Sequence, residues 1–278
     1  MTARFWRFTA APKPPPSPDR QDDDEEEKES SATLAIYGPI VADRDRIWLE
    51  DGIGASPAAF REELAALGEI DTLNVHINSE GGDVFAGSAI FTLLARSRAR
   101  IIAYIDGLAA SAASLIAMAA DTVRMPTNAL LMVHNPWTVV IGDSRDLYAA
   151  GDRLNIVRQG MVAAYASKTG LPEQRLIALL DAETWLTAEE AVALGFADEI
   201  EQRQVAASVA GDRVTINGQT LDLSSFRRRD RVAALYTPAD MATAASPQTR
   251  VERPHASDDQ QRQAYLEAMR SIAMAQTG

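Results

Sequence analysis

A serine at a strand-to-helix junction is the residue in this sequence best placed to do chemistry. The apolar run 101–105 predicts a strand and the small-residue run 110–120 predicts a helix, so Ser111 lies at the corner between them. Gly107 permits an unusual backbone conformation there, and a helix N-terminus offers unpaired N–H groups that can stabilise an oxyanion. A serine in this place can also simply cap a helix. Ser111 is therefore a candidate nucleophile, with capping as the alternative.

A serine nucleophile needs a general base, and the chain contains three histidines. His255 lies in a polar segment far from the apolar centre of the sequence. His76 falls inside a predicted strand and can be a polar residue on a half-exposed face. His134 directly follows the predicted strand 130–133, and open α/β sheets place their chemistry at the carboxyl ends of strands. His134 is the favoured base.

Four short motifs occur in order along the chain. They are INSEGG at 77–82, GLAAS at 107–111, MVHNP at 132–136 and ETWLTAEEA at 183–191. Together they resemble the ClpP-type serine proteases, specifically the ClpP-like head maturation (prohead) proteases of tailed phages, over about residues 34–200. The resemblance implies an α/β, ClpP/crotonase-like fold of repeated ββα units. It also implies Ser111 as nucleophile and His134 as general base, with no metal and no cofactor.

Two carboxylates compete for the acid position of a catalytic triad in this sequence, Glu183 and Asp181. In cellular ClpP an aspartate occupies the position that Glu183 has here. A glutamate can orient the histidine in a triad, although its longer side chain needs a backbone set farther back. Asp181 would share a face with Glu183 on an extended strand and is the competing candidate. We expect Glu183 to complete the triad.

The glycine pair Gly81 and Gly82 follows a predicted strand and could be a plain tight turn. By resemblance, the N–H groups of Gly82 and Ala112 form the oxyanion hole, and the segment at Gly81 and Gly82 binds substrate peptide as an added strand. Proline usually precedes these glycines in cellular ClpP, whereas Glu80 stands here. This departure makes the loop locally more acidic.

Composition excludes several classes of protein. A net charge of −12 argues against nucleic-acid binding, and the basic run 227–229 is expected to be a solvated tail. With no cysteine and three histidines, the chain offers no disulfide or thiolate chemistry and little basis for a metal site. The apolar run 108–120 is too short to cross a bilayer, and no export signal precedes it. We expect no membrane partner and a cytoplasmic location.

The expected organisation is one domain between two poorly folded ends. Residues 1–33 contain prolines and an acidic run and predict a disordered tail, residues 34–200 form the protease domain, and residues 201–278 form a poorly structured extension. Within the extension, 212–223 predicts a hairpin around Asn217-Gly218 and 261–274 a late helix. Residues 185–194 predict a helix. The helical run 147–168 matches the protruding handle of the family and favours a homo-oligomeric ring.

The expected function is a serine endopeptidase that cleaves scaffold or capsid proteins during prohead assembly, in the host cytoplasm. One alternative is a host ClpP-type peptidase that works with an ATPase unfoldase. A coenzyme A hydratase or isomerase with a crotonase fold is a second, although such an enzyme would need neither Ser111 nor His134. A scaffold protein that has lost catalytic activity is the third.

Overall fold

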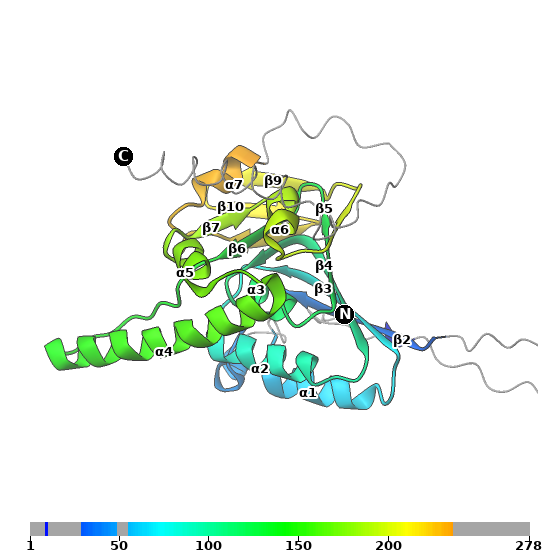
Figure 1. The fold of residues 1–278 in the computed structure, drawn as a ribbon, viewed down its shortest axis with the longest axis horizontal. Helices are drawn as coiled ribbons and strands as arrows, with labels where there is room; N and C mark the ends of the chain where they lie inside the picture. Colours follow the sequence, from blue (N-terminus) through cyan, green and yellow to red (C-terminus); the bar gives the residue numbers. More distant parts are fainter. Residues whose placement is uncertain (1–8, 11–28, 49–54, 236–278) are drawn as a thin grey trace, which may run out of the picture.

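The computed structural model describes residues 9–10, 29–48 and 55–235 and shows a mixed α/β fold (Figure 1). Its main sheet has eight strands, with the order β1-β2-β3-β4-β5-β8 and with β6 and β7 attached beside β4. The strands of this sheet are β1 Thr9–Ala10, β2 Ser31–Tyr37, β3 Thr72–Ser79, β4 Arg100–Ala110, β5 Thr122–Pro126, β6 Leu130–Val133, β7 Thr184–Leu186 and β8 Glu199–Glu201. The α/β fold class expected from the sequence is confirmed.

Helices follow the parallel strands in turn, as the alternating pattern predicts. Strands β2, β3, β4, β5 and β8 pair in parallel, and chains that alternate strand and helix form such sheets because each helix covers the face of the sheet it crosses. The helical elements are η1 Asp43–Trp48, α1 Pro57–Ala66, α2 Val84–Ala95, α3 Ala112–Ala117, α4 Ser144–Thr169, α5 Glu173–Asp181, α6 Ala188–Leu194 and α7 Asp230–Leu235.

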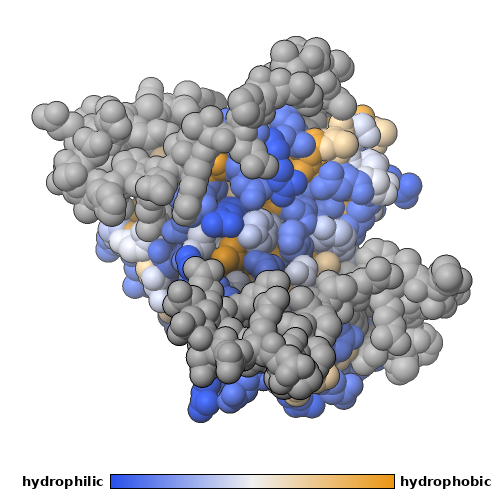
Figure 2. Space-filling view, turned by 90° about the vertical axis from the view of Figure 1, so that its right-hand side faces the viewer, coloured by the Kyte–Doolittle hydropathy of each residue, from blue (hydrophilic) through white to orange (hydrophobic). Residues whose placement is uncertain are grey.

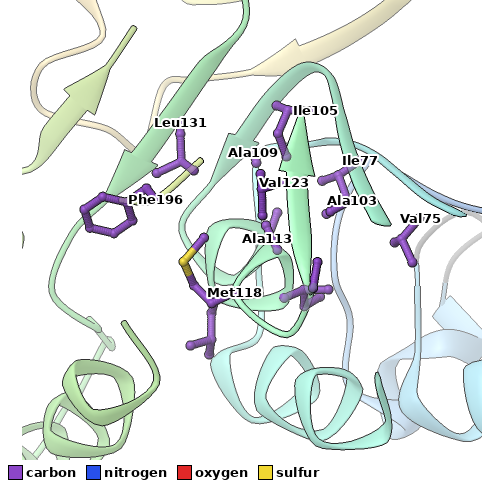
Figure 3. Packing of buried hydrophobic residues seen from close by; sticks show 14 of the residues in the cluster. Val75, Ile77, Ala103, Ile105, Ala109, Ala113, Met118, Val123, Leu131 and Phe196 are labelled. Carbon is purple, nitrogen blue, oxygen red and sulfur yellow. The ribbon is translucent and has the colours of Figure 1, made fainter. Parts of the chain in front are cut away.

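The main core lies between the parallel strands and the helices that cover them. Figure 3 shows Ala113 and Met118, from α3 and its C-terminal end, close to Ala109 and Val123 of the sheet, with Phe196 beside them. Each of these side chains is 5% exposed or less. The small alanines let α3 lie close to the sheet, which fixes the backbone at the start of the helix.

Strand β4 changes partner along its length. Its first half pairs with β5 through Ile102–Tyr104, and its second half pairs with β6 through Leu108–Ala110. Strand β6 then pairs antiparallel with β7. The carboxyl ends of β4 and β6 therefore lie side by side, and the residues that follow them, Ser111 and His134, are brought together.

A second sheet covers this branch of the main sheet. Its strands are β9 Ala207–Ala210, β10 Arg213–Ile216 and β11 Gln219–Asp222, in the order β11-β10-β9. In Figure 1 this part of the chain, in yellow and orange, lies over β6 and β7. A separate apolar cluster joins the two layers: Leu108, Ala110, Leu130, Met132 and Trp185 from the main sheet, and Val205, Ala207, Val214, Ile216, Leu221, Leu223, Phe226 and Val232 from the segment after it.

The extension after residue 200 differs from its sequence-based expectation. The hairpin expected at 212–223 is present as β10 and β11, which turn at Asn217 and Gly218 with positive φ angles of 50° and 79°. The neighbouring residues, expected to be poorly structured, form β9 and α7 as well. The apolar face of the hairpin packs against the main sheet. The tail expected to be disordered over residues 1–33 has structure at residues 9–10 and 31–33, which form β1 and the start of β2 and pair with each other. Residues 1–8 and 11–28 and the late helix at 261–274 lie outside the described residues.

The predicted helix 185–194 is wrong at its start. Residues Thr184–Leu186 form strand β7, in which Leu186 pairs with Leu131 and Trp185 with Met132. The helix begins only at Ala188, after a capping box in which the Thr187 side chain accepts the Glu190 N–H. Residues 185–194 therefore belong to two elements, because the first of them pair with β6 as a strand and the helix starts after them.

Helix α4 projects from the body of the molecule with its first half (Figure 1). Its buried side chains are concentrated in the second half, at Met161, Val162, Tyr165 and Thr169, whereas Tyr148 and Ile156 are 77% and 67% exposed. Neither α4 nor any other helix of the described residues combines the length and the apolar character of a membrane span.

Candidate active site

Ser111 sits in a strained backbone conformation between β4 and α3. Its φ and ψ angles are 55° and −125°, a combination that residues with a side chain rarely adopt. The Ser111 N–H donates to the carbonyl oxygen of Met132 on β6, 3.0 Å away, and this bond ties the corner to the neighbouring strand. The Ser111 side chain makes no capping bond to α3. The hydroxyl is thereby presented to the neighbouring strand end rather than to its own helix.

His134 meets this hydroxyl from the end of β6. Its Nε2 lies 2.7 Å from the Ser111 Oγ, which is hydrogen-bonding distance. The side chain is buried, and burial is the main cause that lowers the pKa of His134; the Arg227 charge lowers it further and the Glu183 charge opposes both. Since the ordinary histidine pKa is about 6.5, the ring is neutral at pH 7 and able to accept a proton.

The other serines near this corner are engaged elsewhere. Ser114 Oγ donates to the carbonyl oxygen of Ser111 at 2.7 Å and lies 2.9 Å from the hydroxyl of Tyr165. Ser79 is fully buried, and its Oγ accepts the N–H of Gly81 at 3.0 Å. Both hydroxyls hold the local backbone in place, so Ser111 is the hydroxyl of the described corner that faces a histidine.

The histidine of strand β3, His76, has partners other than Ser111. His76 Nδ1 lies 2.7 Å from Asp106 Oδ2, and its ring stacks on Tyr104 with centroids 4.7 Å apart. These contacts agree with the expectation that His76 is a polar residue on a half-exposed strand. His255 lies outside the described residues.

Glu183 and Asp181 face different partners. Glu183 is buried and has a φ of 47°, and its two carboxylate oxygens accept the backbone N–H groups of Arg227 (3.1 Å) and Arg228 (2.7 Å). Asp181 ends α5, is exposed, and accepts a hydrogen bond from the Asn135 side chain at 2.7 Å. Their expected shared face on an extended strand is wrong, because helix α5 continues to Asp181 and the chain turns at Glu183. Of these two carboxylates, Glu183 is the one whose charge acts on the pKa of His134 and raises it, against the larger lowering effect of burial.

The glycine segment lies directly beside the serine. A Cβ on Gly81 would come within 2.7 Å of the Ser111 Cβ, and a Cβ on Gly82 would come within 2.0 Å of the Ile40 carbonyl oxygen. Ile40 donates to Gly81 and accepts from Asp83 in a parallel bridge, so the N–H of Gly82 points away from Ile40. Gly82 and Ala112 both border the same cavity as Ser111 and His134.

Glu80, the residue that departs from the family pattern, is largely buried in this loop. Burial, with a smaller contribution from the nearby Asp222 charge, raises the pKa of Glu80 to about 7. Among the described residues, its buried Oε2 has no hydrogen-bond partner. The loop therefore carries a carboxyl group that is partly protonated at neutral pH, instead of a fixed negative charge.

An open cavity of about 760 Å³ surrounds the pair of Ser111 and His134. Its apolar wall comes from three places: the loop after β6, the α2 N-terminus and the face of α4, namely Trp137, Val139, Val140, Phe85, Val84, Ala150, Leu154, Val157 and Met161. Trp137, Val139 and Phe85 are 62%, 78% and 69% exposed. The site can accept an extended chain with apolar side chains.

Sequence reasoning missed the contribution of the segment around residue 226. The ring of Phe226 packs edge-on against His134 with centroids 5.6 Å apart, and the next two residues bind Glu183 through their backbones. The basic run that includes Arg227 and Arg228, expected to be a solvated tail, thus contacts the site. The one signal for this was the alternation of apolar residues in the hairpin, since an apolar face requires a partner.

Comparison with known proteins identifies the family. The Clp protease family model matches residues 30–204. The chain is 32% identical over 144 residues to the ATP-dependent Clp protease proteolytic subunit 1 of Mycobacterium leprae, covering 50% of this chain and 71% of the relative. It is 30% identical over 144 residues (51% and 72%) to subunit 2 of Treponema denticola, and 26% identical over 170 residues (58% and 82%) to subunit 1 of Protochlamydia amoebophila. This chain belongs to the Clp protease family and is a serine-type peptidase.

Proposed function

We propose that Ser111, His134 and Glu183 form the catalytic triad of this peptidase. The observation that carries the proposal is the 2.7 Å contact between Ser111 Oγ and His134 Nε2 at the paired ends of two strands. A neutral histidine in contact with a serine hydroxyl is the arrangement that nucleophilic catalysis requires. Glu183 is the buried carboxylate whose charge favours the protonated form of His134.

The reaction follows from these positions. Ser111 Oγ attacks the peptide carbonyl carbon while His134 Nε2 takes the hydroxyl proton, and the negative oxygen formed is stabilised by the N–H groups of Gly82 and Ala112. His134 then gives the proton to the leaving amine, and an acyl-enzyme remains on Ser111. Water, deprotonated by His134, attacks this ester, releases the carboxylic acid and restores the hydroxyl.

Substrate binding uses the cavity wall and the glycine segment. Ile40 pairs with one side of Gly82, which leaves the other side of residues 81–82 facing the cavity. An extended peptide can pair with this free side through its backbone, and its apolar side chains can contact Trp137 and the α4 face. Backbone pairing tolerates many sequences, which suits an enzyme that degrades a whole scaffold protein.

We place this activity in capsid maturation, with scaffold or coat protein as substrate, inside an assembling prohead in the host cytoplasm. Residues 1–29 and 205–278 fall outside the Clp protease match. Such added segments can recruit the enzyme to shell subunits at high local concentration and offer it sites for self-cleavage. The second support for capsid maturation is the resemblance of the four sequence motifs to those of phage head maturation proteases.

A second function has a specific observation in its favour. The matched relatives carry the name ATP-dependent Clp protease proteolytic subunit. In this second function, the chain supplies the peptidase chamber for a separate ATPase that unfolds its substrates, and the added segments do not recruit the enzyme to shell subunits.

Assembly into a homo-oligomeric ring is part of both proposals. Exposed apolar side chains gather on the projecting half of α4 and the loop before it, at Val139, Ile141, Leu147, Tyr148 and Ile156. By contrast, the described surface on the face shown in Figure 2 is mostly hydrophilic, with small apolar patches. A projecting helix with apolar side chains is suited to packing against a second copy. Light scattering should show an oligomer at micromolar concentration; a monomer would contradict the ring.

The test separates the two functions. We expect the protein, co-expressed with its capsid and scaffold proteins, to cleave scaffold and its own C-terminal residues without ATP, and the Ser111→Ala variant to leave both intact. Intact ends in assembled particles, together with degradation of folded substrate only when an ATPase is added, would replace maturation by the unfoldase-dependent function. Full cleavage by Ser111→Ala would refute the assignment of the nucleophile.

A further inference from the structure

The carboxylate of the proposed triad is held by residues that lie outside the Clp protease match. That match ends at residue 204, whereas the N–H groups on the Glu183 oxygens belong to Arg227 and Arg228. Within the described residues, no other hydrogen bond to this carboxylate is present. A buried carboxylate without partners is costly, so these two donors satisfy the Glu183 oxygens and fix the direction of the side chain.

The same turn also contacts the histidine. The Phe226 ring lies edge-on to His134, with an interplanar angle of 75°, and edge-on to Trp185, with centroids 5.6 Å apart in both pairs. Ser225 and Phe226 border the cavity that holds Ser111. The imidazole is therefore confined between the serine hydroxyl and the Phe226 ring, which limits its rotation and excludes water from its side.

We infer that residues 205–232 are a permanent part of the active site, in which the turn 225–228 positions Glu183 and His134 for catalysis. The inference rests on the proposed triad. Arg227, Arg228 and Phe226 are positioning residues, since their backbone N–H groups and ring act through Glu183 and His134.

Burial argues that this segment is permanent and not a lid that opens. Eight of its apolar side chains, from Val205 to Val232, are 5% exposed or less in the cluster shared with the main sheet. The packing is close: a Cβ on Gly107 of β4 would come within 2.1 Å of the Ile216 side chain. Opening the segment would expose all of these side chains to water at once, which opposes any regular opening.

Directional polar contacts fix the segment at both ends. Asn217 Nδ2 donates to the Asp106 carbonyl oxygen at 2.7 Å, and Val205 N–H donates to Asn128 Oδ1 at 2.8 Å. Beyond the turn, Arg231 donates to both Glu190 carboxylate oxygens at 3.0 Å. The turn at 225–228 is thus held between anchored elements, as a positioning element must be.

One consequence concerns self-cleavage. If the segment completes the site, a cut before Val232 removes part of the active site and ends the activity of that copy. C-terminal self-trimming that leaves an active enzyme must therefore occur after Val232. A chain that ends at Leu235 should keep the kcat of the full chain.

The decisive comparison is Arg228→Pro with Arg228→Ala in the full chain. Proline removes the N–H that binds Glu183 Oε1, whereas alanine keeps it and removes only the side chain. We expect Arg228→Pro to lower kcat on the order of 10²-fold with little change in KM, because a small displacement of a catalytic group has an effect of this size. Arg228→Ala should lose far less.

The pH dependence of kcat/KM in Phe226→Ala is a measurement that would not change if Phe226 had only a structural role. Burial is the main cause of the lowered pKa of His134, so removing the ring should raise that pKa and shift the acidic limb of kcat/KM to higher pH. A lower melting temperature, with the acidic limb of kcat/KM at the same pH as in the parent protein, would mean that Phe226 contributes only to stability. If Arg228→Pro fails to fold, the pH profile of Phe226→Ala decides whether the turn 225–228 has a positioning role.

The outcomes also separate this inference from the triad assignment. Parent-level kcat in Arg228→Pro, with activity still lost in Ser111→Ala and Glu183→Gln, would overturn the positioning role and leave the triad in place. A rise in kcat would show that the segment inhibits the enzyme. Activity retained in Ser111→Ala would remove the proposed function itself.

Discussion

In residues 30–204 the proposed reacting groups are side chains at the ends of strands, whereas residues 205–232 reach the same site mainly through backbone N–H groups and one aromatic ring. The first region depends on residue type, since a nucleophilic hydroxyl and a basic imidazole belong to particular side chains. The second depends on shape, since almost any residue offers an N–H group in a suitably placed turn. Sequence motifs therefore indicate the groups of the first region, but they do not indicate the backbone contacts of the second.

The two regions also differ in how they are stabilised. The core under Ser111 is formed by α3 and the parallel strands, while the second cluster joins β6 and β7 to the strands β9, β10 and β11. Both clusters meet along β4, where Ala109 belongs to the first cluster and its neighbours Leu108 and Ala110 belong to the second. Changes in either cluster can reach the site, but through different groups.

The largest expected effect is on the reacting side chain itself. Ser111→Ala should lower kcat on the order of 10⁴–10⁶-fold, because the hydroxyl that forms the acyl-enzyme is absent. Ser114→Ala is the matched control: it removes a hydroxyl three residues away, bonded to Tyr165, and should cost about 1 kcal/mol of unfolding free energy with most activity retained. Peptide hydrolysis and thermal melts measure both. A fluorophosphonate label found on Ser114 would overturn the assignment.

The carboxylate that lies between the two regions should have the next largest effect. Glu183→Gln should lower kcat on the order of 10³–10⁴-fold, since the amide cannot stabilise the imidazolium as an anion does. Asp181→Asn should change kcat little, because Asp181 is exposed and bonded to Asn135 and Arg158. Steady-state kinetics on both variants decides between them. The reverse result would move the role to Asp181.

A substitution in the proposed oxyanion hole changes the first region alone. A Cβ at Gly82 would come within 2.0 Å of the Ile40 carbonyl oxygen, and the φ of 145° there disfavours any side chain. We expect Gly82→Ala to displace its N–H and lower kcat by about 10²–10³-fold. Gly151→Ala is the control, since this helical glycine has no neighbour within 4 Å of an added Cβ and should keep its activity. Equal kcat in the two variants would exclude Gly82 as a donor.

Much of the first region could be predicted from the sequence. The alternation of strands and helices, the junction at Ser111 and the strand end at His134 are local patterns, and the structure has them where the sequence indicates. The triad role of Glu183 stays a prediction, and the expected extended strand through Asp181 is wrong. Helix α5 runs to Asp181 and a positive φ at Glu183 turns the chain, which no local pattern in the sequence indicates.

The second region could be predicted only in part. Asn217 and Gly218 indicate the hairpin, and its alternating apolar residues indicate that one face is buried. Which surface it covers depends on contacts between residues far apart in the sequence, such as Ile216 with Gly107. Three consecutive arginines resemble a solvated run, and the backbone bonds of Arg227 and Arg228 to Glu183 leave no trace in residue type.

The smallest expected effect is a pair of opposite shifts in the pKa of His134, one from each region. The charge of Arg227 lowers this pKa and the charge of Glu183 raises it, although burial remains the larger influence. Arg227→Ala keeps the N–H on Glu183 but removes the positive charge, so the pKa of His134 should rise and the acidic limb of kcat/KM should move to higher pH. Glu183→Gln removes the negative charge and should move the limb to lower pH.

At pH well above the limb, Arg227→Ala should lose less than about tenfold in rate, because the proton acceptor is then fully neutral. NMR titration of the His134 ring in both variants measures the shifts without relying on residual activity. Shifts in the same direction would show that the two charges do not act on His134 from the places the structure gives them.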